Sequence, residues 1–170
     1  QVVLPSGLTS TTEVDKTYGS SGADLMVYTL QTTQEGISSL MTVDARVGLT
    51  TFTSAENRVS SIYRDPTTQQ TNRIESGGLL PLLYLYDDHG RVIEQSVGER
   101  TTTYVYDDAV SLGKLTRMTT PDAKTHEYEY DTFGRINKVI YPDGYTSATE
   151  YDENGNLKTL IVPTQQAHPF

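Results

Sequence analysis

The amino-acid sequence predicts an all-β chain of antiparallel β-hairpin repeats that share a continuous sheet. Three observations lead to this prediction: a motif built on Tyr-Asp recurs along the chain, the composition favours strands, and no segment has the sustained apolar period of an amphipathic helix. Repeats of this length usually stack on their neighbours, because a single unit is too small to bury its own apolar side chains.

The composition is lean in apolar bulk. Hydrophobic residues make up 35% of the chain, whereas globular domains average roughly 45–50% when glycine is included. The aromatic residues include 12 tyrosines and no tryptophan. Tyrosine and the abundant threonine both suit a half-exposed strand. Sheets are therefore expected rather than a thick hydrophobic core.

The charge and the cysteine count exclude several classes of partner and cofactor. The net charge of −9 argues against nucleic acid and anionic membranes, which are bound through clustered cations. The most apolar segment, Leu79–Tyr86, is too short to span a bilayer and contains Pro81. Without cysteine there are no disulfides or thiolate metal sites, which leaves the compartment open. No cofactor is expected.

The length of 170 residues suits a single domain. Because the sequence begins at Gln1 with neither an initiator Met nor a signal peptide, it is interpreted as a fragment of a larger protein. We expect one repeat region over 1–170, which is loosely repeat-like over 1–40, repetitive over 41–162 and an exit segment over 163–170.

The Tyr-Asp motif recurs with a regular period. Its aspartates lie at positions 44, 65, 87, 107, 131 and 152, which are 20 to 24 residues apart. The copies at Asp44 and Asp65 are weak, and the unit at Asp107 recovers its glycine only after an insertion, at Gly113. The motif residues are Tyr86, Asp87, Gly90, Arg91, Tyr106, Asp107, Gly113, Tyr130, Asp131, Gly134, Arg135, Pro142, Asp143, Gly144, Tyr151, Asp152, Gly155 and Asn156.

Each unit is interpreted as a hairpin. The segment Tyr145–Tyr151 alternates in the manner of a strand. Turns are predicted at Asp87–Gly90, Asp131–Gly134, Pro142–Gly144 and Asp152–Gly155, since Asp bonds to its own backbone and Gly permits a positive φ.

Two points stay open from the sequence. On the return strands the apolar residues are three apart, as in Ile136 and Val139 or Leu157 and Leu160, which implies a bulge or burial on both faces. Upstream, Leu8–Val14 and Leu25–Leu30 have strand composition without a clear copy of the motif.

The candidate chemical sites have simpler structural interpretations. The repeat tyrosines could stack against sugars, but packing across neighbouring strands is preferred. The pairs Asp87/Asp88 and Asp107/Asp108 invite an acid–base role, although turn formation is preferred. The histidines, His89, His126 and His168, share no ligand spacing.

A calcium site is also rejected. Asp152, Asn154 and Asn156 have the spacing of the first ligands of an EF-hand. However, Leu157 stands where the loop needs Gly, and Pro163 stands where it needs Glu.

The order of Tyr-Asp, a short turn, Gly-Arg or Gly-Asn, a hydrophobic strand and Pro-Asp-Gly resembles the Rhs/YD-repeat (tyrosine-aspartate repeat) family. The similarity is strongest over Asp131–Pro163, and Leu4–Thr12 resembles a segment upstream of such repeats. The resemblance implies a spiral shell of antiparallel strands around a variable C-terminal polypeptide, which is a toxin in bacterial Rhs and insecticidal-toxin-complex proteins. In teneurins, similar repeats belong to adhesion proteins. The dipeptide Asp65-Pro66 does not match the family's self-cleavage motif.

From this resemblance we expect a non-catalytic, structural segment of a curved sheet or spiral shell that encapsulates or presents a C-terminal toxin or effector. The alternative is a carbohydrate- or cell-surface-binding β module. The expected partners are the rest of the repeat shell, a C-terminal cargo polypeptide and, in the alternative, glycans, in a secreted or cell-surface location.

Overall fold

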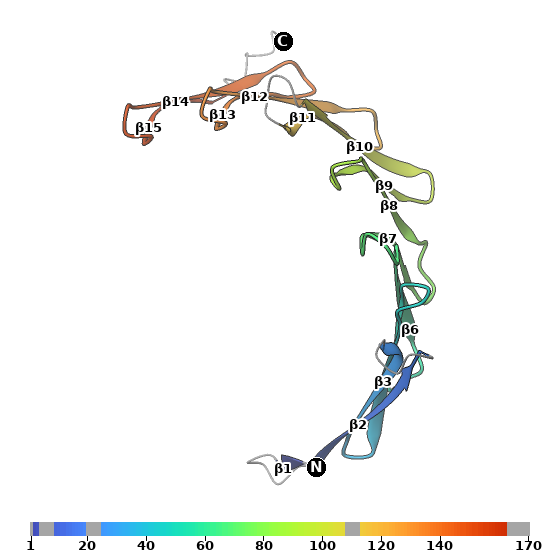
Figure 1. The fold of residues 1–170 in the computed structure, drawn as a ribbon. Helices are drawn as coiled ribbons and strands as arrows, with labels where there is room; N and C mark the ends of the chain where they lie inside the picture. The colour runs from blue at the N-terminus through green and yellow to red at the C-terminus, as the bar shows by residue number, and fades with distance from the viewer. Residues whose placement is uncertain (1, 4–8, 20–24, 108–112, 163–170) are drawn as a thin grey trace, which may run out of the picture. The chain divides into compact units, whose positions relative to one another are not determined.

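A computed structural model describes residues 2–3, 9–19, 25–107 and 113–162 (Figure 1). All regular structure in these ranges is β, which confirms the predicted fold class, and no helix in them is long and apolar enough to cross a membrane. The strands are β1 (Val2–Val3), β2 (Thr9–Tyr18), β3 (Leu25–Gln34), β4 (Ile37–Asp44), β5 (Leu49–Thr53), β6 (Val59–Arg64), β7 (Thr71–Ser76), β8 (Leu82–Tyr86), β9 (Val92–Val97), β10 (Arg100–Asp107), β11 (Lys114–Thr119), β12 (Thr125–Tyr130), β13 (Ile136–Ile140), β14 (Thr146–Tyr151) and β15 (Leu157–Ile161).

The strands follow one another in chain order, from β1 to β15 (Figure 1). The chain divides into two compact units, of which the first contains residues 1–90 and 96–98 and the second contains residues 91–95 and 99–170. Within each unit, consecutive strands pair in antiparallel fashion, as β5 with β6 and β12 with β13. Both units are therefore meanders of hairpins.

The predicted turns lie where the sequence places them. Each is closed by a backbone hydrogen bond of 2.9 Å, which the N–H of Gly90, Gly134, Gly144 or Gly155 donates to the carbonyl three residues earlier. All four glycines have a positive φ, between 75° and 83°. In the related Pro121-Asp122-Ala123 turn, which lacks the glycine, Ala123 takes a φ of 60°.

The upstream segments are strands as well. The region predicted around Leu8–Val14 is β2, and the region predicted at Leu25–Leu30 is β3. Both strands have 10 residues and are paired with each other, so they are longer than expected. Leu8, part of Leu4–Thr12 and the predicted exit segment 163–170 lie outside the described residues.

A bulge explains the apolar residues that are three apart. Tyr128 pairs with Val139 and Tyr130 with Ile136, so Asn137 is an extra residue in β13. Because directly paired residues share a face, Ile136 and Val139 both lie on the face of these tyrosines. The same irregularity between β14 and β15 places Leu157 opposite Tyr151 and Leu160 opposite Thr149.

One face of the second unit carries no Asp, Glu, Lys or Arg at the paired positions of β11–β15, and we call it the tyrosine face. Met118 pairs with His126 across β11 and β12, and Val139 pairs with Ser147 across β13 and β14. The paired residues of this face are Leu115, Met118, His126, Tyr128, Tyr130, Ile136, Val139, Ser147, Thr149, Tyr151, Leu157 and Leu160, and Tyr104 and Tyr106 join them from β10.

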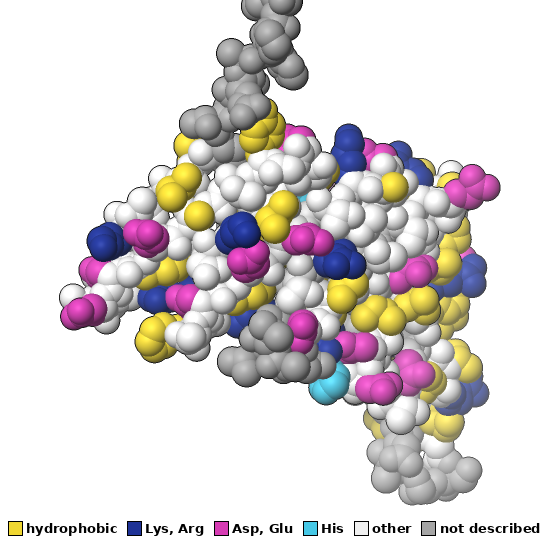
Figure 2. All heavy atoms as spheres, turned by 90° about the horizontal axis from the view of Figure 1, so that it is seen from above, with side chains coloured by type: hydrophobic (Ala, Val, Ile, Leu, Met, Phe, Trp, Pro, Cys, Tyr) yellow, Lys and Arg dark blue, Asp and Glu magenta, His cyan; other side chains and the backbone are white. Residues whose placement is uncertain are grey.

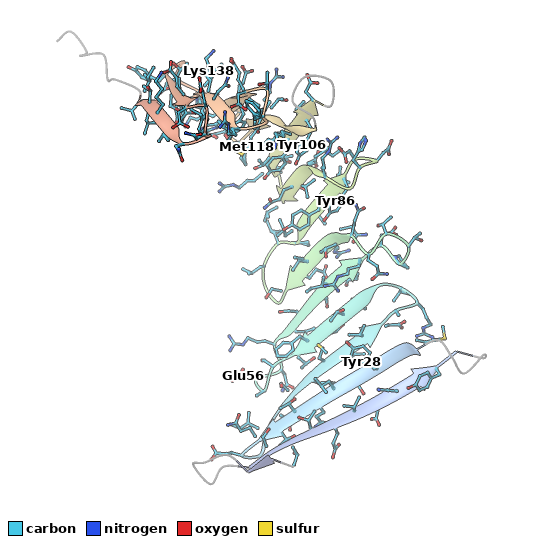
Figure 3. All side chains as sticks on the ribbon, turned by 60° about the vertical axis from the view of Figure 1, so that its left-hand side comes forward. Tyr28, Glu56, Tyr86, Tyr106, Met118 and Lys138 are labelled. Atoms are coloured by element: carbon cyan, nitrogen blue, oxygen red, sulfur yellow. The ribbon has the colours of Figure 1, made fainter. Side chains whose placement is uncertain are left out.

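The opposite face of these strands is charged. Lys138 Nζ lies 2.8 Å from Glu129 Oε1, and Arg117 Nε lies 3.3 Å from Glu127 Oε1, in both cases across a strand pair. Figure 2 shows acidic and basic side chains interspersed over this unit, and in Figure 3 Lys138 and Met118 are labelled on opposite sides of the ribbon. The second unit is thus a sheet with two chemically different faces.

The first unit has a similar division. Ile62 pairs with Ile74, and Ile74 with Leu82, so these three apolar side chains share a face, whereas Leu83 pairs with Arg73 on the opposite face. On the opposite face, Tyr63 donates a hydrogen bond of 2.9 Å to Glu75. The apolar face also includes Tyr28, Leu30, Met41, Val43 and Phe52.

No hydrophobic side chain among the described residues is buried, and Ser61 is the one buried residue there. A single layer of sheet can shield its apolar side chains only by neighbouring strands and not by a second layer. The lean composition agrees with this arrangement. The apolar and tyrosine faces therefore need a covering that the described residues do not supply.

Candidate functional site

The contacts that recur along the chain lie at the ends of the strands that the Tyr-Asp turns connect. Asp131 Oδ1 accepts hydrogen bonds of 2.9 Å from the backbone N–H groups of Phe133 and Arg135. Its Oδ2 accepts a hydrogen bond of 2.7 Å from Arg135 Nε. The bond from the N–H two residues later, at 2.8–3.0 Å, recurs at Asp44, Asp65, Asp87 and Asp152. The weak copies of the motif therefore share this side-chain bond, although the backbone bond that closes the turn at Asp65 comes from Gln69, four residues later.

These donors stabilise the ionised aspartates. The backbone N–H and the side-chain amide of Asn156 lower the pKa of Asp152. Burial raises the pKa of Asp131, but the hydrogen bonds from Arg135 outweigh it, and the net pKa is below the usual value. The carboxylates act as acceptors within the turn, which leaves them poorly suited to proton transfer.

The tyrosine of each clear repeat reaches back to the preceding one. The Tyr130 hydroxyl donates a hydrogen bond of 2.7 Å to the carbonyl of Leu115, two residues after Gly113. Burial, and then Tyr128, raise the pKa of Tyr130. Equivalent bonds run from Tyr86 to Thr71 (2.6 Å), from Tyr106 to Val92 (2.9 Å) and from Tyr151 to Ile136 (3.2 Å).

The residue after each turn glycine lies over the next tyrosine. The Arg135 guanidinium is 4.1 Å from the ring centroid of Tyr151, the distance at which a cation is attracted by the face of an aromatic ring. The same arrangement joins Arg91 to Tyr106 at 4.7 Å and Lys114 to Tyr130 at 5.7 Å. Arg91 Nη1 also donates a hydrogen bond of 3.0 Å to the carbonyl of Gly113.

The side chain of the residue after each turn glycine also lies close to the glycine of the next Tyr-Asp turn. A Cβ placed on Gly134 would be 2.7 Å from Lys114 Cε, and one on Gly155 would be 3.2 Å from Arg135 Nη1. Each turn glycine thus provides both a positive φ and the space for a side chain of the preceding repeat. We call this set of contacting residues the repeat interlock. In one repeat it consists of the turn Asp, the turn Gly and the residue after that Gly, and in the next repeat it consists of the tyrosine and the turn glycine.

The interlock changes toward the N-terminus. Gln70 takes the place of the cation, with its Nε2 at 2.9 Å from a Cβ placed on Gly90. Gln69 takes the place of the glycine, with a φ of 62°. Arg64 stands in the tyrosine position and donates a hydrogen bond of 3.3 Å to Thr50 Oγ1. The sequence prediction missed Gln70 and Lys114, whose only sequence signal is their position after the turn glycine or its substitute.

The Pro-Asp-Gly turn connects β13 and β14 at the strand ends opposite to those of the Tyr-Asp turns. Asp143 Oδ1 accepts a hydrogen bond of 3.1 Å from the N–H of Tyr145. A Cβ placed on Gly144 would have no atom within 4 Å. Pro142, Asp143 and Gly144 therefore form a turn without the contacts between repeats that the Tyr-Asp turns make.

The other candidates for chemistry stay apart. No group of three His, Asp or Glu side chains that could hold a metal ion occurs in the described part of the chain. His126 packs edge-on against Tyr141, with the two rings 6.0 Å apart, and its Nδ1 is buried without a hydrogen-bond partner. Asp108 and His168 lie outside the described residues. Asp87 and Asp88 lie in the turn after β8, in keeping with the interpretation as turn residues.

We expect the free energy of unfolding to fall as the pH is lowered from about 5 toward 2. The Lys124 ammonium and the Thr120 hydroxyl lower the pKa of Asp122 to about 2, and the pKa values of Asp131 and Asp152 are also lowered. A carboxyl whose folded pKa lies below its unfolded value of about 3.9 stabilises the fold fully above that value, and the contribution is lost as the pH falls through the folded pKa.

Urea denaturation at a series of pH values measures this dependence. The double variant Asp131→Asn, Asp152→Asn should lose stability less steeply with acid than the unaltered chain, because two of the titrating groups are gone. The same steepness in both proteins would contradict the assignment.

The family model described as Teneurin YD-shell matches residues 25–170, which is most of the chain. The chain belongs to this family. The resemblance seen in the sequence is thereby confirmed, and membership in the YD-shell family gives the chain a structural role as part of a shell.

Solved structures agree with the YD-shell fold. A crystal structure of TcdB2-TccC3 without its hypervariable C-terminal region is 18% identical, with a TM-score of 0.57 over 89% of this chain and 9% of that chain. A crystal structure of TcdB2-TccC3-Cdc42 is also 18% identical, with a TM-score of 0.56 over 82% of this chain and 8% of that chain. This YD-shell chain spans less than a tenth of either. No curated protein matches it.

Proposed function

We propose that this chain is a non-catalytic wall segment of a shell that encloses a C-terminal toxin or effector, with the tyrosine face turned inward. The observation that carries the proposal is the difference between the two faces of the second unit. The paired positions of β11–β15 on the tyrosine face have no Asp, Glu, Lys or Arg, whereas Glu129, Lys138, Arg117 and Glu127 form ion pairs on the opposite face. An ion-paired face suits water, whereas the apolar and tyrosine side chains of the other face suit an enclosed polypeptide, although Lys114 and Arg135 cover two of its rings.

The repeat interlock supports a role as a wall. Each tyrosine hydroxyl and each residue after a turn glycine contacts the neighbouring repeat, so contacts between repeats accumulate along the sheet. We assign the repeat motif residues from Tyr86 to Asn156 to this structural role, within a repeat region over 41–162. A chain that serves as a wall needs no cofactor.

The comparison with TcdB2-TccC3 supports the choice of occupant. That protein has a hypervariable C-terminal region, and a variable C-terminal polypeptide is the cargo that we propose for the shell to which this chain contributes. The remaining partners are the other repeats of the same shell. A secreted or cell-surface location accords with toxin complexes and teneurins.

A carbohydrate-binding module is the second candidate and has less support. The hydroxyls of Tyr106, Tyr130 and Tyr151 already donate to backbone carbonyls, and a cation covers one side of each ring. Sugar stacking requires an accessible ring face. The engagement of the tyrosines within the sheet favours the wall.

Cysteine labelling tests which face is enclosed. The chain has no cysteine of its own, so Ser147→Cys and Ala148→Cys each introduce one thiol, at neighbouring half-buried positions on opposite faces of β14. In the complete gene product we expect a bulky thiol reagent to modify Ala148→Cys readily and Ser147→Cys slowly. Equal rates in the intact protein, or faster labelling of Ser147→Cys, would contradict enclosure of the tyrosine face.

A further inference from the structure

The turn between β14 and β15 differs from the other Tyr-Asp turns in one residue that matters chemically. Asn154 precedes the turn glycine, Gly155, where the equivalent positions hold His89 and Phe133. The other asparagines of the chain are followed by Arg, Lys or Leu. An asparagine before glycine is the arrangement in which the backbone can attack the side-chain amide most easily, because glycine has no Cβ to obstruct the approach and the widest conformational freedom.

We propose that Asn154 is a site of spontaneous covalent modification whose rate is set by opening of the turn between β14 and β15. The backbone nitrogen of Gly155 attacks Cγ of Asn154, and a new C–N bond forms. The C–N bond to the side-chain amide breaks, and ammonia leaves with the proton that the Gly155 nitrogen gives up. Water then opens the cyclic imide to give aspartate or isoaspartate, with no change of oxidation state.

The folded turn holds the nucleophile in check. The Gly155 N–H donates a hydrogen bond of 2.9 Å to the carbonyl of Asp152, which ties up the nitrogen that must attack. The Asn154 N–H donates a hydrogen bond of 2.9 Å to Asp152 Oδ1, and the Asn156 N–H donates one of 2.8 Å to the same oxygen. The attack therefore requires these bonds to break, and the reaction rate follows the fraction of time that the turn is open.

The product weakens the turn that produced it. A carboxylate at position 154 stands beside Glu153 and near Asp152, so like charges meet in one turn. Isoaspartate also lengthens the backbone by one carbon next to Gly155, which packs against Arg135 Nη1. Modification at this turn would loosen the interlock between the last two repeats described.

Peptide mapping by mass spectrometry during incubation of the 170-residue chain near neutral pH tests the proposal. We expect Asn154 to be converted while Asn137 and Asn156 stay intact, and conversion to be at least about tenfold faster in urea than in the folded chain. Asp152→Ala should speed the conversion in the folded chain about fivefold or more, since it removes the hydrogen bonds that Asp152 accepts from the Asn154 and Asn156 N–H groups and loss of even one would give this factor. Asp143→Ala, which removes the bond to the Tyr145 N–H in the Pro-Asp-Gly turn, is the matched control and should not change the rate at Asn154.

The variant Asn154→His carries the residue of the first clear repeat and should abolish modification at this turn while the fold is retained. If Asn154 resists conversion even in urea, the proposal is overturned. Equal rates in the folded and denatured chain, or an equal acceleration by Asp143→Ala and Asp152→Ala, would overturn the control by the turn.

Discussion

Gly134→Val should lower the free energy of unfolding by about 2–3 kcal/mol. The φ of Gly134 is 75°, a region in which a residue with a Cβ costs about 1–2 kcal/mol and a β-branched residue is an outlier. The new side chain would also displace Lys114, whose Cε is 2.7 Å from the position of the added Cβ. Lys114 can swing away, but it then leaves the face of Tyr130, a contact worth about 0.5–1 kcal/mol.

Two further variants separate these effects in urea denaturation. Gly144→Val has the same strain, at a φ of 83°, but its Cβ meets no atom within 4 Å, so the loss should be about 1–2 kcal/mol. Asp88→Ala changes an exposed turn residue and should cost less than about 0.5 kcal/mol. Equal losses for the two valine variants would show that Lys114 does not matter at Gly134. Equal stability of Gly134→Val and Asp88→Ala would contradict the turn itself.

The sequence was sufficient to predict the features that depend on residues close together in the chain. Asp and Gly at set offsets specify the turns, because the aspartate bonds its own backbone and the glycine accepts a positive φ. The three-residue spacing of Ile136 and Val139 pointed to a bulge, and the register confirms it at Asn137. The period even located the weak turns at Asp44 and Asp65, which bond their backbones as the clear ones do.

The contacts between repeats could not be predicted in the same way. Lys114 reaches Tyr130 and Gly134 because of the register of β10–β12 and because its side chain extends from one turn to the next. A period in the sequence states that units recur, but not which side chain crosses the boundary between them. Gln70 shows the difficulty, because it takes the cation's place without its charge.

The division between the two faces depends on the bulges. Strict alternation along β13 would place Ile136 and Val139 on opposite faces, and the tyrosine face would not be recognised. Once the extra residue at Asn137 is known, the apolar positions of β13 and β15 join the tyrosines. The surface that we propose to face the cargo therefore follows from the register rather than from composition.

This chain, produced as these 170 residues, should self-associate, and more strongly as salt rises. The strand order ends at β1 and β15, so each of these strands has a paired neighbour on one side only, and an edge of this kind templates pairing with another chain. On β15, Leu157, Leu160 and Ile161 are all more than half exposed. The net charge of −9 opposes association, but salt screens it with a Debye length of about 8 Å at physiological ionic strength.

Light scattering across a salt series measures this association, with far-UV circular dichroism alongside to confirm folding. Ile161→Lys places a cation on the edge strand and should suppress association, because charged side chains on an edge block pairing between sheets. Thr146→Lys makes the same change of net charge on β14, which has neighbours on both sides, and is the matched control. Each lysine lowers the net negative charge and weakens self-repulsion, so an effect of net charge alone would raise association equally in both variants and would contradict edge pairing. A folded monomer at every salt concentration would mean that the chain protects its own edges, and the interpretation as part of a larger sheet would have to give way to a self-contained β domain.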